Sequence, residues 1–138
     1  MGTAEQVNDY CCITALNLNC CVFNVNYRLG PEVKCPTGMQ DFIDCLKLVH
    51  EKAEIFSVDT SRVCIAGLSG GGWIVAGAAN ILAKEGEIGL VKAMFIHTGQ
   101  LSDETASIPE DQLEKPAEYW LAPFCTATYK LHATDFEA

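Results

Sequence analysis

The chain of 138 residues has the length of one domain, and 49% of its residues are hydrophobic against 20% charged, which excludes an intrinsically disordered chain. Nine Lys and Arg against eighteen Asp and Glu give a net charge of −9, which argues against a nucleic-acid-binding surface. No apolar run reaches about 18 residues, so we expect no membrane span. The first residues lack the features of a secretory signal, so we expect a cytoplasmic protein.

Eight cysteines are spread along the chain, at positions 11, 12, 20, 21, 35, 45, 64 and 125. Without a secretory signal, we expect reduced thiols rather than a disulfide framework. No Cys-x-x-Cys pair occurs and no His lies at zinc-finger spacing from two cysteines, so no metal site is predicted. We expect Cys20, Cys45 and Cys64 to be small buried hydrophobic residues of strands and a helix.

The N-terminal half of the chain predicts a helix, a strand and a second helix. Residues 6–16 favour a short helix. Residues 21–27 are rich in β-branched and aromatic side chains and precede Leu29-Gly30-Pro31, which is typical of a strand that ends there. Residues 38–50 repeat apolar side chains at helical spacing, and Thr37 with Gln40 forms a capping-box pattern for the start of this helix.

The following segments continue the alternation of strands and helices. Residues 63–66 predict a short strand, and residues 70–84 predict a buried helix that ends near Gly86. Residues 91–96 predict a third strand. This order is typical of an α/β fold with parallel strands and crossover helices that flank the sheet. After Thr98 the periodicity ends, and we expect residues 98–138 to form an acidic, irregular tail with short helical pieces.

The sharpest signal for chemistry is Gly67-Leu68-Ser69-Gly70-Gly71, which lies between a predicted strand and a predicted helix. A serine on such a sharp turn has a strained backbone that exposes its Oγ, and glycines at 67 and 71 avoid clashes with it. The Gly70 amide lies at a helix N-terminus, where an N–H can stabilise a developing oxyanion. The pattern predicts Ser69 as a nucleophile and Gly70 as an oxyanion donor.

Two other interpretations of these glycines stay open. One is close packing of a helix on a sheet without any chemistry. The other is phosphate binding, although the Gly-x-x-x-x-Gly-Lys-Ser/Thr sequence is absent and no lysine lies between Lys52 and Lys84. The run Gly70-Gly71-Gly72 also does not supply the dinucleotide-binding pattern in register with the strand.

Several further motifs occur in a fixed order along the chain. They are Tyr27-Arg28-Leu29-Gly30-Pro31-Glu32, Cys35-Pro36, Asp41, Asp59-Thr60-Ser61-Arg62-Val63 and Gly67-Leu68-Ser69-Gly70-Gly71-Gly72. Together they resemble the hormone-sensitive-lipase-like branch of the α/β-hydrolases, which includes carboxylesterases and arylacetamide-deacetylase-type enzymes. In that branch alanine is usual at position 30, aspartate at 68 and alanine at 70. Gly70 keeps the backbone N–H that the oxyanion role requires.

The resemblance implies one partial α/β-hydrolase domain over residues 1–138, with residues 1–97 matching the family core. It implies a sheet order of 1-2-4-3-5-6-7-8, with residues 21–27, 63–66 and 91–96 as strands 4, 5 and 6. Strand 3 and the His-Gly-Gly-Gly motif with the other oxyanion donors would precede Met1. The acid and histidine of the triad would follow the last residue. We therefore expect a second chain or segment to complete the sheet.

None of the three histidines is identified as a general base for Ser69, and no triad acid is identified. His97 ends the third predicted strand and matches no catalytic position of the family. His132 precedes Asp135, whereas the order in this fold is serine, acid, histidine. His50 lies at the end of an amphipathic helix, where solvent or the helix dipole is its expected partner.

By this resemblance, the chain is expected to be a serine hydrolase of the esterase or lipase type that acts on small acyl esters without a metal or organic cofactor. Loss of the triad's working unit lowers turnover by a factor on the order of 10⁶ in a comparable enzyme, so the chain alone is expected to be nearly inert. The alternatives are a non-catalytic α/β-hydrolase-like binding module for a small apolar ligand or a partner protein, and an inactive fragment.

Overall fold

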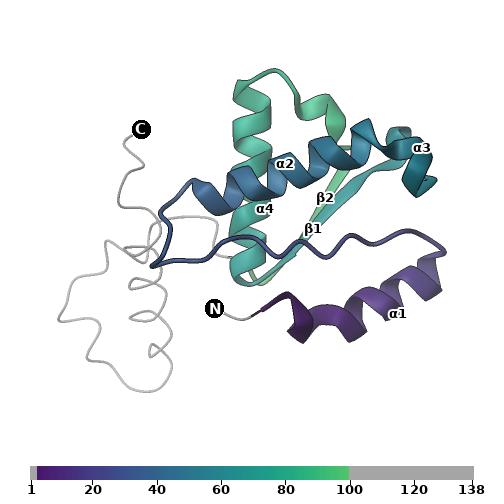
Figure 1. The fold of residues 1–138 in the computed structure, drawn as a ribbon, viewed down its shortest axis with the longest axis horizontal. Coiled ribbons are helices and arrows are strands. Elements are labelled where there is room, and N and C mark those ends of the chain that lie inside the picture. Colours follow the sequence, from purple (N-terminus) through teal and green to yellow (C-terminus); the bar gives the residue numbers. More distant parts are fainter. Residues whose placement is uncertain (1–2, 100–138) are drawn as a thin grey trace.

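The computed structural model describes residues 3–99 (Figure 1). The expected irregular tail beyond Gly99, and with it His132 and Asp135, lies outside the described residues. In chain order the elements are η1 (Ala4–Val7), α1 (Asn8–Leu18), α2 (Thr37–Glu51), α3 (Ala53–Phe56), η2 (Thr60–Arg62), β1 (Cys64–Leu68), α4 (Gly70–Lys84), η3 (Ile88–Leu90) and β2 (Ala93–His97).

The sheet consists of β1 and β2, which pair in parallel with Cys64 opposite Ala93 and Leu68 opposite His97. The α4 helix connects the two strands, so β1, α4 and β2 form a strand–helix–strand crossover unit. This confirms the predicted α/β class with a parallel sheet. The strand predicted over residues 63–66 is present but shifted: β1 begins at Cys64 and continues to Leu68.

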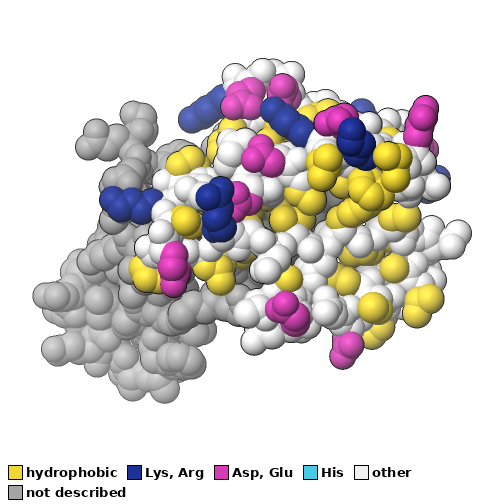
Figure 2. Space-filling model, viewed as in Figure 1, with side chains coloured by type: hydrophobic (Ala, Val, Ile, Leu, Met, Phe, Trp, Pro, Cys, Tyr) yellow, Lys and Arg dark blue, Asp and Glu magenta, His cyan; other side chains and the backbone are white. Residues whose placement is uncertain are grey.

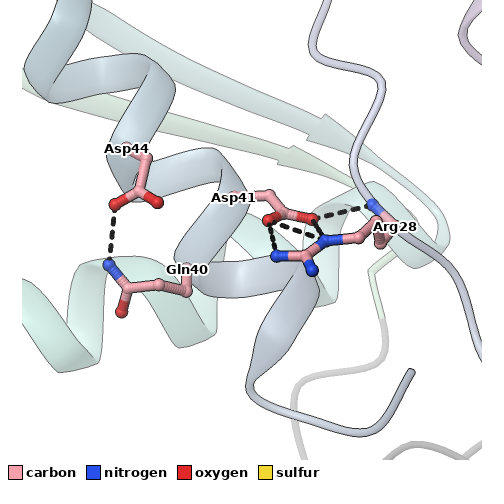
Figure 3. Close-up of polar contacts among 4 residues, drawn as sticks. All are labelled: Arg28, Gln40, Asp41 and Asp44. Carbon is pink, nitrogen blue, oxygen red and sulfur yellow. Dashed lines mark hydrogen bonds and ion pairs between the residues drawn. The ribbon is translucent and has the colours of Figure 1, made fainter.

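The helices predicted around this sheet are present, with one error at a helix start. The α4 helix has the predicted bounds, and Gly86 follows it with a φ of 77°, a left-handed conformation that ends the helix. The capping box at Thr37 is wrong. Thr37 is already the first residue of α2, Pro36 precedes it without a side-chain cap, and the Gln40 side chain instead donates to Asp44 Oδ1 at 2.9 Å (Figure 3).

The predicted strand over residues 21–27 is wrong for the part of the chain that the structure describes. Residues 20–29 form no regular element there and pair with neither β1 nor β2. The segment lies beside the start of α1 instead, where the Asn24 side chain donates to Ala4 O at 2.7 Å and to Asn8 Oδ1 at 2.9 Å. β-Branched residues favour extended backbone, but a strand also needs a neighbour that accepts its hydrogen bonds.

One hydrophobic core holds α2, α4 and β1 together. It is formed by residues that are at most 8% exposed: Cys35, Met39, Ile43, Leu46, Ile65, Ile74, Val75, Ala78 and Leu82. Ile43, Val75 and Leu82 are the largest side chains that are fully enclosed. Each such side chain contributes about 1.5–3 kcal/mol by leaving water, so these contacts account for the packing of the two helices on one face of the sheet.

The opposite face of the sheet is exposed in residues 3–99. Along β1, Ile65 is buried, whereas Cys64, Ala66 and Leu68 on the other side of the strand are exposed. The exposed residues of β2 include Phe95, at 57%. Further apolar side chains are exposed around α3 (Figure 2), where Ile55 is 76% exposed. Within the described part of the chain, no helix combines the length and hydropathy that a membrane span requires.

The expected burial of three cysteines is wrong. Cys20 and Cys64 are exposed, and Cys45 is half-buried, which raises the pKa of its thiol. Cys20 directly follows the left-handed Asn19 that ends α1, and Cys64 lies on the sheet face that no described helix covers. Among the cysteines of residues 3–99, Cys35 belongs to the core.

Candidate active site

Ser69 lies at the turn between β1 and α4, as the sequence predicts. Its backbone has φ 53° and ψ −118°, an unfavourable conformation for a residue with a side chain, at a cost on the order of 1–3 kcal/mol. Its side chain is exposed and makes no capping hydrogen bond to the helix that follows. The turn therefore presents the Ser69 hydroxyl to the outside at the carboxyl end of a parallel strand.

The strained turn is held on both sides by backbone hydrogen bonds. The Ser69 N–H donates to the carbonyl oxygen of His97, the last residue of β2, at 2.9 Å. The Ser69 carbonyl oxygen accepts from the N–H groups of Gly72 at 2.9 Å and Trp73 at 3.4 Å. Ser69 is therefore tied both to the neighbouring strand and to the first turn of α4.

Close packing explains the glycine at position 67 but not the glycines at positions 70 and 71. A Cβ on Gly67 would overlap the Gly71 carbonyl oxygen and would lie 2.5 Å from Gly71 C and 2.6 Å from Gly72 N. The prediction for Gly71 is wrong within residues 3–99, since a Cβ there would meet nothing within 4 Å. The carbonyl group of Gly71, not its missing side chain, makes the close approach. Space is likewise open beside Gly70.

Gly70 is the first residue of α4, a helix of 15 residues. The N–H groups of a helix's first turn have no acceptor within the helix, and the helix dipole places partial positive charge there. Gly70 N–H, the first amide of the helix, follows directly after the exposed Ser69 side chain. This arrangement can place one hydrogen-bond donor beside a carbonyl oxygen that Ser69 attacks.

His97 and His50 do not supply a base to Ser69 in the described residues. His97 ends β2 as predicted. It contacts Ser69 through its backbone carbonyl oxygen, which accepts the Ser69 N–H. Its side chain is exposed, and the centroid of its ring lies 6.5 Å from that of Phe95. His50 lies in the last turn of α2, as predicted, and its Nε2 also lies 3.0 Å from the carbonyl oxygen of Leu90. Leu90 precedes β2, at the end of the sheet opposite to Ser69.

An ion pair that the sequence did not predict joins two of its motifs (Figure 3). Arg28 donates to Asp41 from Nη2 at 2.6 Å, from Nε at 3.0 and 3.1 Å to the two carboxylate oxygens, and from its backbone N–H at 2.9 Å. These bonds from Arg28 lower the pKa of the Asp41 carboxyl group. They attach the end of the irregular segment to α2, where the neighbouring Tyr27 packs against the core. The only sequence signal was the fixed order of the motifs.

Asp59 has a comparable structural function in front of β1. Its carboxylate accepts from the backbone N–H of Ser61 at 2.9 Å and from the Ser61 hydroxyl at 2.6 Å, and these bonds lower its pKa. Asp59 thereby caps η2, the turn that leads into β1. The part of the chain covered by the structure contains no group of three or more His, Cys, Asp and Glu side chains suited to a metal ion.

Comparisons with known proteins agree with this geometry. Residues 1–134 match the model of a family described as alpha/beta hydrolase fold. An arylesterase of Saccharolobus solfataricus is 30% identical over 90 residues, which are 65% of this chain and 29% of that enzyme. The solved structure of a bacterial heroin esterase aligns with a TM-score of 0.80 at 30% identity, over 96% of this chain and 41% of its own.

A second solved structure, EstE1, is a thermophilic carboxylesterase cloned from a metagenomic library. It aligns with a TM-score of 0.73 at 25% identity and covers 99% of this chain and 49% of its own. The chain thus spans less than half the length of these solved esterases and less than a third of the arylesterase. The matched family model, the parallel sheet and the strand-to-helix turn agree: the chain belongs to the α/β-hydrolase fold family, in its hormone-sensitive-lipase-like branch.

Proposed function

We propose that this chain supplies the nucleophile of a serine esterase that cleaves small acyl esters, of the carboxylesterase or lipase type. The observation that carries the proposal is Ser69, whose exposed side chain stands on a positive-φ turn between β1 and α4. The similarity to an arylesterase and to two solved esterases supports the same class of reaction.

In the proposed reaction, Ser69 Oγ attacks the acyl carbonyl carbon and loses its proton to a general base. The Gly70 N–H donates to the oxygen that becomes negatively charged. Collapse of the tetrahedral intermediate releases the alcohol, which takes up the proton, and leaves an acyl-enzyme that water hydrolyses. Residues 3–99 place no base at Ser69, so the base and its acid would come from polypeptide outside the described residues, and no metal or organic cofactor is needed.

We further propose that residues 1–138 form a single partial domain whose sheet is completed by a second chain or segment. The free edge of β1 and the backbone of residues 20–29 have no strand partner within residues 3–99. An open strand edge presents unpaired N–H and C=O groups that readily pair with another strand, so this edge favours an added strand. A cooperative thermal transition of a species that sediments as a monomer would contradict this proposal.

Labelling with a fluorophosphonate tests the nucleophile. We expect slow labelling of the chain at Ser69 that Ser69→Ala abolishes. Ser57→Ala is the matched control, because Ser57 is also exposed and has a φ of 54° against 53° for Ser69. Labelling that persists in Ser69→Ala, or none in a sample whose circular dichroism and thermal transition show a folded protein, would refute an activated Ser69.

The alternative proposal is a non-catalytic binding module or an inactive fragment with the same fold. It is favoured by the lack of a base at Ser69 within residues 3–99. Saturable binding of a small apolar ester without turnover or labelling would support the binding module. A cytoplasmic location belongs to our proposal as well. It is consistent with the free thiols of six cysteines, which are Cys11, Cys12, Cys20, Cys21, Cys45 and Cys64.

A further inference from the structure

A second strained residue lies next to the Ser69 turn. Thr98 directly follows β2 and has a φ of 55°, in the left-handed region. This conformation is unusual for any residue with a side chain, and for a β-branched residue it is a genuine outlier. If the chain needed only a reversal after β2, glycine would adopt this conformation without strain. The threonine at this position therefore calls for a reason beyond the turn itself.

The two strained residues are linked through one carbonyl group. The carbonyl oxygen of His97 accepts the N–H of Ser69 at 2.9 Å and the hydroxyl of Thr98 at 2.7 Å. Ser69 follows β1 and Thr98 follows β2, and the last residues of these strands, Leu68 and His97, are paired. The Thr98 hydroxyl thus bonds to the same oxygen that fixes the Ser69 backbone.

The reversal at Thr98 also brings the chain against the first turn of α4. A Cβ on Gly72 would lie 2.9 Å from the Cα of Gly99 and 2.8 Å from Cγ2 of Ile96. Gly72 is buried, and its N–H donates to the Ser69 carbonyl oxygen at 2.9 Å. Residues 97–99 are therefore packed on the same turn of helix that holds Ser69 from the other side.

We propose that Thr98 is a positioning residue for Ser69. Its hydroxyl fixes the direction of the His97 carbonyl group, so that the Ser69 N–H stays bonded and the serine keeps the φ and ψ that expose its Oγ. The purpose of this positioning rests on the proposed nucleophilic function of Ser69. The hydrogen-bond link itself does not, so the two are tested by different measurements.

Hydrogen exchange of the Ser69 amide in the full 138-residue chain tests the link. Thr98→Val removes the hydroxyl and keeps the β-branch, Thr98→Gly removes the hydroxyl and the strain, and Thr98→Ser keeps the hydroxyl. We expect the Ser69 amide to exchange about tenfold faster in the Val and Gly variants, which corresponds to one ordinary hydrogen bond. In Thr98→Ser the rate should stay close to that of the unsubstituted chain.

Two controls separate this effect from a general loss of stability. The Lys92 amide donates to Val63 O at 2.9 Å at the other end of the strand pair and should keep its exchange rate in every variant. Thr14→Val, in the α1 helix, is the matched threonine-to-valine change away from the site. If Thr98→Val fails to fold, Thr98→Gly gives the same test in a backbone without strain.

Three results would overturn the proposal. They are an unchanged Ser69 rate in Thr98→Val and Thr98→Gly, an equal acceleration in Thr98→Ser, and an unprotected Ser69 amide in the unsubstituted chain. Fluorophosphonate labelling reports separately on the proposed function. A protected Ser69 amide that responds to Thr98 in a chain that is not labelled would refute the nucleophile and leave the positioning link intact.

Discussion

Replacing Gly67 with alanine should disrupt the Ser69 turn more than any other single methyl group added to it. The new Cβ would overlap the Gly71 carbonyl oxygen and lie 2.5 Å from Gly71 C and 2.6 Å from Gly72 N. All three are backbone atoms, which cannot move aside by a change of rotamer. Either β1 and α4 must separate or the turn at Ser69 must open.

The size of the effect follows from this geometry. Overpacking by added methylene groups typically destabilises a protein by about 1–3 kcal/mol, and occasionally by more. Because the overlap is with the backbone, we expect Gly67→Ala to lower the free energy of unfolding by about 3 kcal/mol or more. This is a large part of the roughly 5–15 kcal/mol that stabilises an ordinary domain. Fluorophosphonate labelling of Ser69 should also be lost, because the turn that exposes the Ser69 hydroxyl is disrupted.

Equilibrium urea unfolding of the full chain, followed by circular dichroism, measures this change. Gly70→Ala is the matched control, three residues away in the same turn, because a Cβ there would meet nothing within 4 Å. Alanine is favoured over glycine in a helix by roughly 0.5–1 kcal/mol, so the control should be neutral or slightly stabilising. Equal midpoints for Gly67→Ala and Gly70→Ala would refute the packing explanation.

Three further predictions concern the rest of the fold. Leu82→Ala, at a fully buried position, should lower the free energy of unfolding by about 2–5 kcal/mol, whereas Leu16→Ala, at a side chain that is 82% exposed, should change it by no more than about 0.5 kcal/mol. The folded pKa of Asp41 lies below its unfolded value, so its ion pair stabilises the fold above the unfolded pKa and this contribution is lost as the pH falls through the folded pKa. Asp41→Asn should remove that part of the acid dependence, and an unchanged pH profile of stability would contradict it. The rings of Phe23 and Phe56 lie edge to face, with their centroids 5.2 Å apart. A double-mutant cycle to alanine should give a coupling free energy of about 0.5–1.5 kcal/mol in the stability of the fold. Additive effects of the two substitutions would show that the contact contributes nothing.

The parts of the fold that the sequence predicts well are those specified by local patterns. The helix over residues 70–84 is apolar on nearly every face and has the predicted bounds, because its period and the following glycine are both local signals. The turn at Ser69 is also local, since a strand, a serine flanked by glycines and a helix follow one another directly.

The errors have a common physical cause, which is dependence on neighbours distant in sequence. Residues 21–27 have strand composition, but hydrogen bonding in a strand requires a partner that residues 3–99 do not provide. Cys20 and Cys64 were expected to be buried, although burial depends on which element covers them. Two further features also depend on tertiary placement, which no residue spacing specifies. They are the bonds between Arg28 and Asp41 and the bond from the Ser69 N–H to the His97 carbonyl oxygen.

The crossover unit of β1, α4 and β2 has a consequence for how the protein folds. Its strands, its helix and the turn at Ser69 are all made from residues 64–97, without an inserted segment. Each pairing of β1 with β2 joins residues 29 positions apart, since Cys64 lies opposite Ala93. Parallel pairing of this kind must close a loop before its contacts form, so it is slow compared with helix formation. We expect α4 to form first and the two strands to pair on it afterwards. The reactive turn, whose Ser69 N–H bonds to the end of β2, would then be among the later features of the molecule to take shape.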